Sequence, residues 1–195
     1  MRIGRNKWFN GLLGALSALA LAAAFSLPAA ASDFKGTVRL TVAADYTKSM
    51  DLSTARDRLD KVFEQLFTTG TGSSQANVLW HDERTLTDGS NENLDLSGVL
   101  MDSFGDSVAL VKVKGLIIKN QSTTQTLSVG GAASAQFSTW VGAVTDIVKV
   151  PPGGVLCLFN PAGYTVTNTT ADLLKILNSA GASCIYDIII IGNGA

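Results

Sequence analysis

The segment Cys184-Ile185-Tyr186-Asp187-Ile188-Ile189-Ile190-Ile191, close to the C-terminus, decides the fold. Successive side chains of a strand point to opposite faces, so the isoleucine run is apolar on both faces. A strand with two apolar faces is typical of the interior of a sheet rather than of its edge. The segment therefore predicts a central strand.

Further strands are predicted upstream of this segment. Residues 108–119 form the longest candidate, in which valine and lysine side chains alternate from Val111 to Lys114. Residues 146–150 alternate as well and end at Pro151-Pro152, where missing amide donors stop a β-ladder. The other candidates are residues 37–42, 76–80, 94–96, 125–129, 155–159, 164–167 and 173–177.

These short strands, separated by turns rich in Gly, Ser, Thr and Asn, predict an all-β fold. Their spacing of roughly 8–12 residues favours a β-sandwich of jelly-roll or Greek-key type. The sequence shows no internal repeat and no linker, so we expect a single domain over residues 32–195. The side chains predicted to point into its core are those of Val113, Ile117, Val129, Val155, Leu174, Ile188 and Ile190.

Residues 52–67 are ambiguous between helix and strand. Leu59, Val62, Phe63 and the pair Leu66-Phe67 follow helical spacing, and polar residues fill the opposite face. A short amphipathic helix near residues 55–66, capped by Ser53 or Thr54, is the preferred prediction. A strand is the alternative.

The first 31 residues have the three parts of a secretory signal peptide. Basic residues at the start precede an apolar stretch over residues 11–27, and Pro28 leads into Ala29-Ala30-Ala31. This stretch is short for a membrane span of about 20 residues. We expect cleavage after Ala31 and export to the periplasm, cell surface or medium, with an uncleaved anchor as the alternative.

The exported chain has the charge of a mildly acidic protein. Removal of residues 1–31 leaves 12 basic and 16 acidic residues, a net charge of −4. Scattered Lys and Arg residues give no basic patch for a phosphate backbone, so we expect no nucleic-acid partner. No segment after residue 31 is both apolar and long enough to cross a membrane. We therefore expect no membrane association once the signal peptide is removed.

The chain has 2 cysteines, Cys157 and Cys184, both in predicted strands. An even number of cysteines in an oxidising compartment favours a disulfide between them. Two free thiols that pack as small apolar side chains are the alternative. The pairing requires the Cα atoms to lie within about 7 Å of each other.

No arrangement of residues predicts catalysis, a cofactor or a metal. The only histidine, His81, precedes Asp82, but neighbours on a strand point to opposite faces and do not converge on one ion. We expect this cluster to be structural, with Asp82 or Glu83 paired to Arg84. Acidic residues such as Asp95, Asp102 and Asp106 are expected to be solvated loop carboxylates.

Two aromatic residues are candidates for contact with a ligand or partner. Trp140 lies in a loop-like stretch, and Tyr164 begins a predicted strand. Partly exposed aromatic rings stack on sugar rings, whereas packing against the core is the alternative role.

Several stretches resemble a family of small β-rich proteins of tailed phages and prophages, which are regarded as virion structural or capsid decoration components. The matching stretches lie in order across residues 69–192 and are Thr69-Gly-Thr-Gly-Ser-Ser-Gln-Ala-Asn-Val-Leu-Trp-His-Asp-Glu-Arg-Thr-Leu86, Glu92-Asn-Leu-Asp-Leu-Ser-Gly98, Val129-Gly-Gly-Ala-Ala-Ser134, Val150-Pro-Pro-Gly-Gly-Val155, Ala171-Asp-Leu-Leu-Lys175 and Tyr186-Asp-Ile-Ile-Ile-Ile-Gly192. The signal peptide departs from the family pattern, because virion proteins assemble in the cytoplasm. The departure implies recruitment to an exported role or an unusual phage route.

The resemblance implies a phage-like, non-enzymatic structural subunit that forms a homo-oligomer or binds another structural protein. Its means of association are expected to be strand edges and apolar patches. The alternative is a secreted or periplasmic β-sandwich module that binds glycans or cell-surface ligands through Trp140 and Tyr164.

Overall fold

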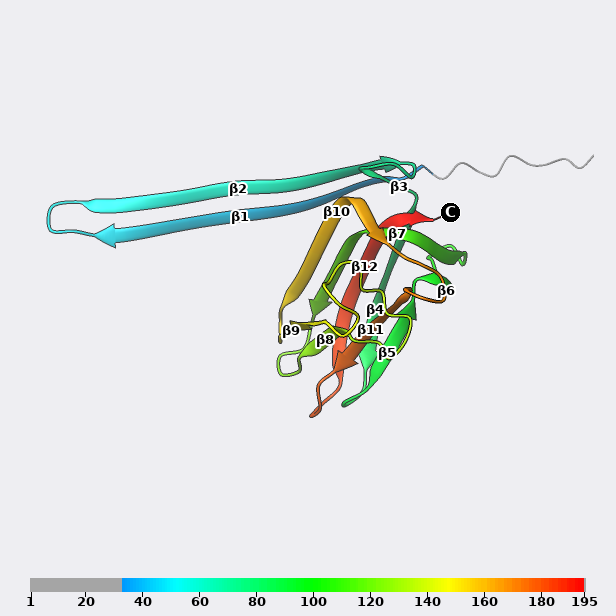
Figure 1. Ribbon diagram of the computed structural model, residues 1–195. Coiled ribbons are helices and arrows are strands. Elements are labelled where there is room, and N and C mark those ends of the chain that lie inside the picture. The colour runs from blue at the N-terminus through cyan, green and yellow to red at the C-terminus, as the bar shows by residue number, and fades with distance from the viewer. Residues whose placement is uncertain (1–32, 195) are drawn as a thin grey trace, which may run out of the picture. The chain divides into compact units, whose positions relative to one another are not determined.

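The computed structural model describes residues 33–194, in which every helix or strand element is a strand (Figure 1). No helix in that range is suited to crossing a membrane. The predicted signal peptide over residues 1–31 lies outside the described residues. The strands are β1 (Lys35–Ser49), β2 (Thr54–Thr69), β3 (Gln75–Ala76), β4 (Val78–Leu86), β5 (Asn91–Asp95), β6 (Ser97–Met101), β7 (Ser107–Asn120), β8 (Leu127–Gly130), β9 (Ile147–Val150), β10 (Val155–Thr165), β11 (Leu173–Asn178) and β12 (Cys184–Gly194).

Two of the sheets form a β-sandwich, which confirms the predicted fold class. The five-stranded sheet has the order β10-β7-β12-β4, with β6 paired to β7, and the four-stranded sheet has the order β5-β11-β8-β9. The chain crosses repeatedly from one sheet to the other, so most neighbours within a sheet are distant in sequence. The third sheet contains β1, β2 and the short β3.

The core lies between the five-stranded and four-stranded sheets. One sheet contributes Val113, Ile118 and Ile190, and the other contributes Val129 and Leu174, all of them buried. Alternate residues of each strand supply these side chains, as expected for two sheets that each bury one face. Burial of this shared apolar surface is the main stabilising contribution to the sandwich.

The predicted central strand is confirmed, because β12 lies between β7 and β4. The predicted core set needs two corrections. Val155 is 58% exposed, because it lies on the edge strand β10 and points away from the sandwich core. Ile117 is partly buried and packs in a second cluster on the outer face of the five-stranded sheet.

The predicted helix near residues 55–66 is wrong, because this segment belongs to β2. All 15 residues of β1 pair antiparallel with β2, from Lys35 opposite Thr68 to Ser49 opposite Thr54. A helix in this segment would leave the backbone donors and acceptors of β1 without their ladder partners. Cross-strand pairing therefore outweighs the local amphipathic pattern.

The predicted disulfide between Cys157 and Cys184 is absent, and both thiols are free. Cys157 is exposed on β10 opposite Ile117 of β7, and Ile117 lies opposite Ile189 of β12. Cys184 lies five residues along β12 from Ile189. Two strand spacings and five residues separate the Cα atoms by roughly 20 Å. A bridge requires about 7 Å, so these positions do not meet.

Candidate interaction surface

The hairpin of β1 and β2 sorts its side chains into two unlike faces. Residues directly opposite each other share a face, and neighbours along a strand alternate between faces. Leu40 lies opposite Phe63, and Ala44 lies opposite Leu59. One face therefore gathers most of the apolar residues, and we call it the apolar face of the hairpin; it contains Leu40, Val42, Ala44, Tyr46, Leu59 and Phe63. Two charged residues also lie on this face, Lys61 opposite Val42 and Asp57 opposite Tyr46.

The other face of the hairpin carries charged pairs that satisfy each other. Arg39 lies 3.9 Å from Glu64 in an ion pair. The Arg56 Nε donates to Asp45 Oδ1 at 2.8 Å. Val62 and Leu66 also lie on this face, but the Arg39–Glu64 ion pair lies between them, so they do not form a continuous apolar stripe. We call it the polar face of the hairpin.

The base of the hairpin is fastened to the sandwich through its apolar face. Val38 and Phe67 are buried and pack with Ile191, Ile117 and Phe159 of the five-stranded sheet. Phe67 is 1% exposed, which marks it as an anchor of the hairpin. The hairpin is thus tied to the sheet at one end by apolar contacts.

A buried lysine strengthens the same attachment. The Lys114 Nζ donates to the backbone carbonyls of Gly72, between β2 and β3, and of Gln75, the first residue of β3. Burial lowers the pKa of this ammonium group, and the nearby Lys112 lowers it further. The sequence pattern predicts Lys114 on the solvated face of its strand, but here the carbonyls replace water as its partners.

Beyond the base, the hairpin is not covered by any other described part of the chain. Every residue from 39 to 64 is exposed. On the apolar face, Leu40 is 47%, Phe63 is 49% and Tyr46 is 71% exposed. Exposed apolar side chains that gather on one face in this way are typical of an interaction site.

A second apolar surface lies on the outer face of the five-stranded sheet. The exposed side chains there are Leu79 on β4, Ile185 on β12, and Val155 and Cys157 on β10. Ile117 and Ile189 lie between Leu79 and Cys157 and are partly buried. We call this surface, with these six residues, the outer face of the sheet. The charged residues Glu83, Asp187 and Lys119 form the next row on the same face and separate Ile117 and Ile189 from Ile185.

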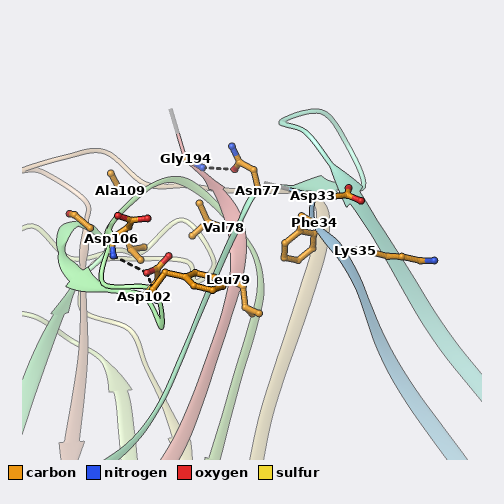
Figure 2. A pocket seen from close by; sticks show the side chains of 13 residues that line it. Asp33, Phe34, Lys35, Asn77, Val78, Leu79, Asp102, Asp106, Ala109 and Gly194 are labelled. Atoms are coloured by element: carbon orange, nitrogen blue, oxygen red, sulfur yellow. Dashed lines mark hydrogen bonds between the residues drawn. The ribbon is translucent and has the colours of Figure 1, made fainter. Parts of the chain in front are cut away.

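A cavity of about 610 Å³ lies beside the start of β1 (Figure 2). Phe34, Leu79 and Phe104 give it an apolar lining, and Asp102 and Asp106 lie at its edge. The Asp102 Oδ1 accepts the backbone N–H groups of Phe104 and Asp106 at 2.9 Å each. This carboxylate therefore closes its own turn.

Trp140 and Tyr164 are both partly buried and pack against the sandwich core. The Trp140 Nε1 donates to the Phe137 carbonyl at 3.0 Å. The Thr139 hydroxyl donates to the Thr165 carbonyl at 2.9 Å, which brings the two segments together. The structure therefore places both aromatic residues in one region, where each uses part of its ring for packing.

The cluster that begins at His81 belongs to a network linking the two sheets of the sandwich. His81 is exposed on β4, and Asp82 lies 2.9 Å from Arg84, as the sequence analysis predicts. Arg84 also lies 2.5 Å from Glu92 of β5 in an ion pair. The Tyr186 hydroxyl of β12 donates to Glu92 at 2.7 Å. Burial, then the Glu92 hydrogen bond, raises the pKa of Tyr186.

Among residues 33–194, no group of three or more His, Cys, Asp or Glu side chains is arranged to hold a metal ion. The chain matches no protein-family model, no curated protein and no solved structure. The apolar face of the hairpin and the outer face of the sheet are therefore the surfaces on which a function can be proposed.

The apolar face of the hairpin is the feature that the sequence analysis missed. Leu59, Phe63 and Phe67 recur every four residues, a spacing that fits one face of a helix and one face of a strand equally well. The alternation of Val38, Leu40 and Val42 pointed to a strand, and it continues to Ala44 and Tyr46. That continuation was the available signal for a long hairpin.

Proposed function

We propose that this protein is a non-enzymatic structural subunit that associates with copies of itself through the apolar face of the hairpin. The observation that carries the proposal is the exposure of Leu40, Tyr46 and Phe63 on one side of a two-stranded ribbon. A two-stranded hairpin is only marginally stable in water. Association supplies the covering layer that the chain lacks.

The apolar surface left exposed is large enough for association to be considered. Large apolar side chains bury about 150–250 Å² each, so the half-exposed members of the apolar face leave roughly 500 Å² for a partner. At about 25 cal/mol per Å², covering that surface contributes on the order of 10 kcal/mol. This is comparable to the 4–15 kcal/mol cost of bringing two proteins together, so a contact of this kind is at the threshold of stable binding.

The proposed role is that of an exported, phage-like surface or capsid decoration subunit. Its support is the resemblance across residues 69–192 together with the signal-peptide pattern before Ser32. A decoration or surface subunit needs a stable body and an element that reaches its neighbours, and the sandwich and hairpin supply these two parts.

The test compares two serine variants of the hairpin by sedimentation velocity. Phe63→Ser removes a ring from the apolar face, and Leu66→Ser removes a side chain of similar exposure from the polar face. We expect the wild type and Leu66→Ser to form one discrete oligomer and Phe63→Ser to dissociate at least tenfold more readily. A monomeric wild type, or equal behaviour of the two variants, would refute the proposal.

A further inference from the structure

We infer that the apolar face of the hairpin covers the outer face of the sheet on a second copy of this chain. This inference rests on the proposed self-association and specifies its acceptor surface. Two surfaces of unmatched chemistry would not stay together in water, so the acceptor must itself be exposed and apolar. The outer face of the sheet meets this condition through the exposed Leu79 and Cys157, with Ile117 between them.

The same two kinds of surface already meet within one chain. At the base of the hairpin, Val38 and Phe67 pack on Ile117, Ile191 and Phe159. Val38 and Phe67 lie on the same side of the hairpin as its apolar face. Ile117 belongs both to this contact and to the outer face of the sheet, so a second hairpin would extend an existing interface.

The dimensions of the two surfaces agree. From Leu40 to Tyr46, the apolar face runs six residues along β1, which is about 20 Å at 3.4 Å per residue. Four strands spaced about 4.8 Å apart make the acceptor sheet about 15–20 Å wide with its side chains. The apolar face of one hairpin therefore spans the acceptor sheet.

The area points to two copies that exchange hairpins reciprocally. One hairpin buries roughly 500 Å² on each partner, below the approximately 800 Å² per partner of a stable interface. Mutual exchange doubles the contact to roughly 1,000 Å² per partner. A two-fold pair in which each copy donates one hairpin and accepts another satisfies the requirement and closes the assembly.

Cys157 on the acceptor surface supplies a native probe for this contact. Ala44 lies on the apolar face of the hairpin and Ala43 on the polar face, and both are exposed. The donor variants are Ala44→Cys with Cys157→Ser, and Ala43→Cys with Cys157→Ser as the matched control. Cys184 is 1% exposed and is present in every sample, so it does not distinguish them.

Each donor variant, expressed as the full chain, is mixed with wild-type protein and treated with a short bismaleimide linker. We expect at least a fivefold excess of the donor–wild-type crosslink for Ala44→Cys over Ala43→Cys, in a particle that sediments as a dimer. Donor–donor crosslinks, or a dimer with no excess, would overturn the inference and leave self-association standing. Monomers throughout would overturn both.

Discussion

At the scale of single residues, a polar network fixes the two sheets of the sandwich to each other. Glu92 of β5 accepts from Arg84 of β4 and from Tyr186 of β12. Tyr186 is fully buried, so its hydroxyl depends on this carboxylate for a partner. The hydrogen bond to Glu92 is the main cause of the raised pKa of Arg84, whose guanidinium is charged in any case.

This network predicts that stability depends on pH through ionisation of the Tyr186 phenol. Its pKa in the folded protein is raised above the unfolded value of about 10, so the folded state retains the proton that the unfolded state loses. The contribution of the neutral phenol is therefore complete below about pH 10 and is lost as the pH rises above that value.

Urea unfolding measures this effect in Tyr186→Phe. We expect a loss of about 1 kcal/mol at neutral pH and a shallower decline of stability above about pH 10. Tyr164→Phe, at a partly buried tyrosine outside this network and outside the hairpin, is the control and should follow the wild type. Identical alkaline slopes for Tyr186→Phe and wild type would show that another group controls the decline.

At the scale of elements, the hairpin and the sandwich depend on different contacts. The sandwich has its own buried core, whereas the hairpin beyond Val38 and Phe67 is exposed on both faces. Regions with few buried apolar contacts contribute little to global stability. We therefore expect the exposed part of the hairpin to be needed for binding a partner and not for folding of the sandwich.

A shortened hairpin tests this separation. Replacing residues 41–62 by Asn-Gly joins Leu40 to Phe63 through a two-residue turn at a position where these residues already face each other. We expect a folded monomer whose melting temperature lies within about 5 °C of the wild type under dissociating conditions. A failure to fold, or retention of the oligomer, would contradict the separation.

The sequence predicts the sandwich better than it predicts the interaction surface, for a physical reason. The isoleucine run from Ile188 to Ile191 has two apolar faces, and burial on both sides of a central strand is the direct consequence. Residues 54–69 instead obey two periods at once, because Leu59 and Phe63 suit either a helix or a strand. Only pairing with β1 decides between them, and pairing is not local in sequence.

Val155 shows a second limit of prediction from the sequence. An apolar strand sequence favours burial but does not state whether the strand lies at an edge or which of its faces meets the core. Val155 is apolar and exposed because β10 is an edge strand. Two residues of the outer face of the sheet, Val155 and Ile117, are consequently predicted from the sequence as core residues.

At the scale of the whole molecule, the distance between the two cysteines determines whether an oxidising compartment can join them. The signal-peptide pattern predicts a mature chain that begins at Ser32, in an oxidising environment. The strand register keeps Cys157 and Cys184 apart, so oxidation does not join them within one chain.

Intact mass of protein recovered from the envelope or medium measures both properties. We expect a chain that starts at Ser32 and carries two alkylatable thiols after denaturation. A chain that starts at Met1 would contradict cleavage and export. A reduced-to-oxidised difference of two protons in the monomer would contradict the separation of the cysteines.

Self-association also has a signature along the whole chain, because covering the hairpin slows the exchange of its amide hydrogens. Hydrogen exchange over a series of protein concentrations measures this directly. We expect residues 40–46 and 59–63 to gain protection as the oligomer forms, while β11, already buried in the sandwich, keeps the same protection throughout. Hairpin exchange that stays fast and independent of concentration in a protein that sediments as an oligomer would show that the hairpin is not the contact.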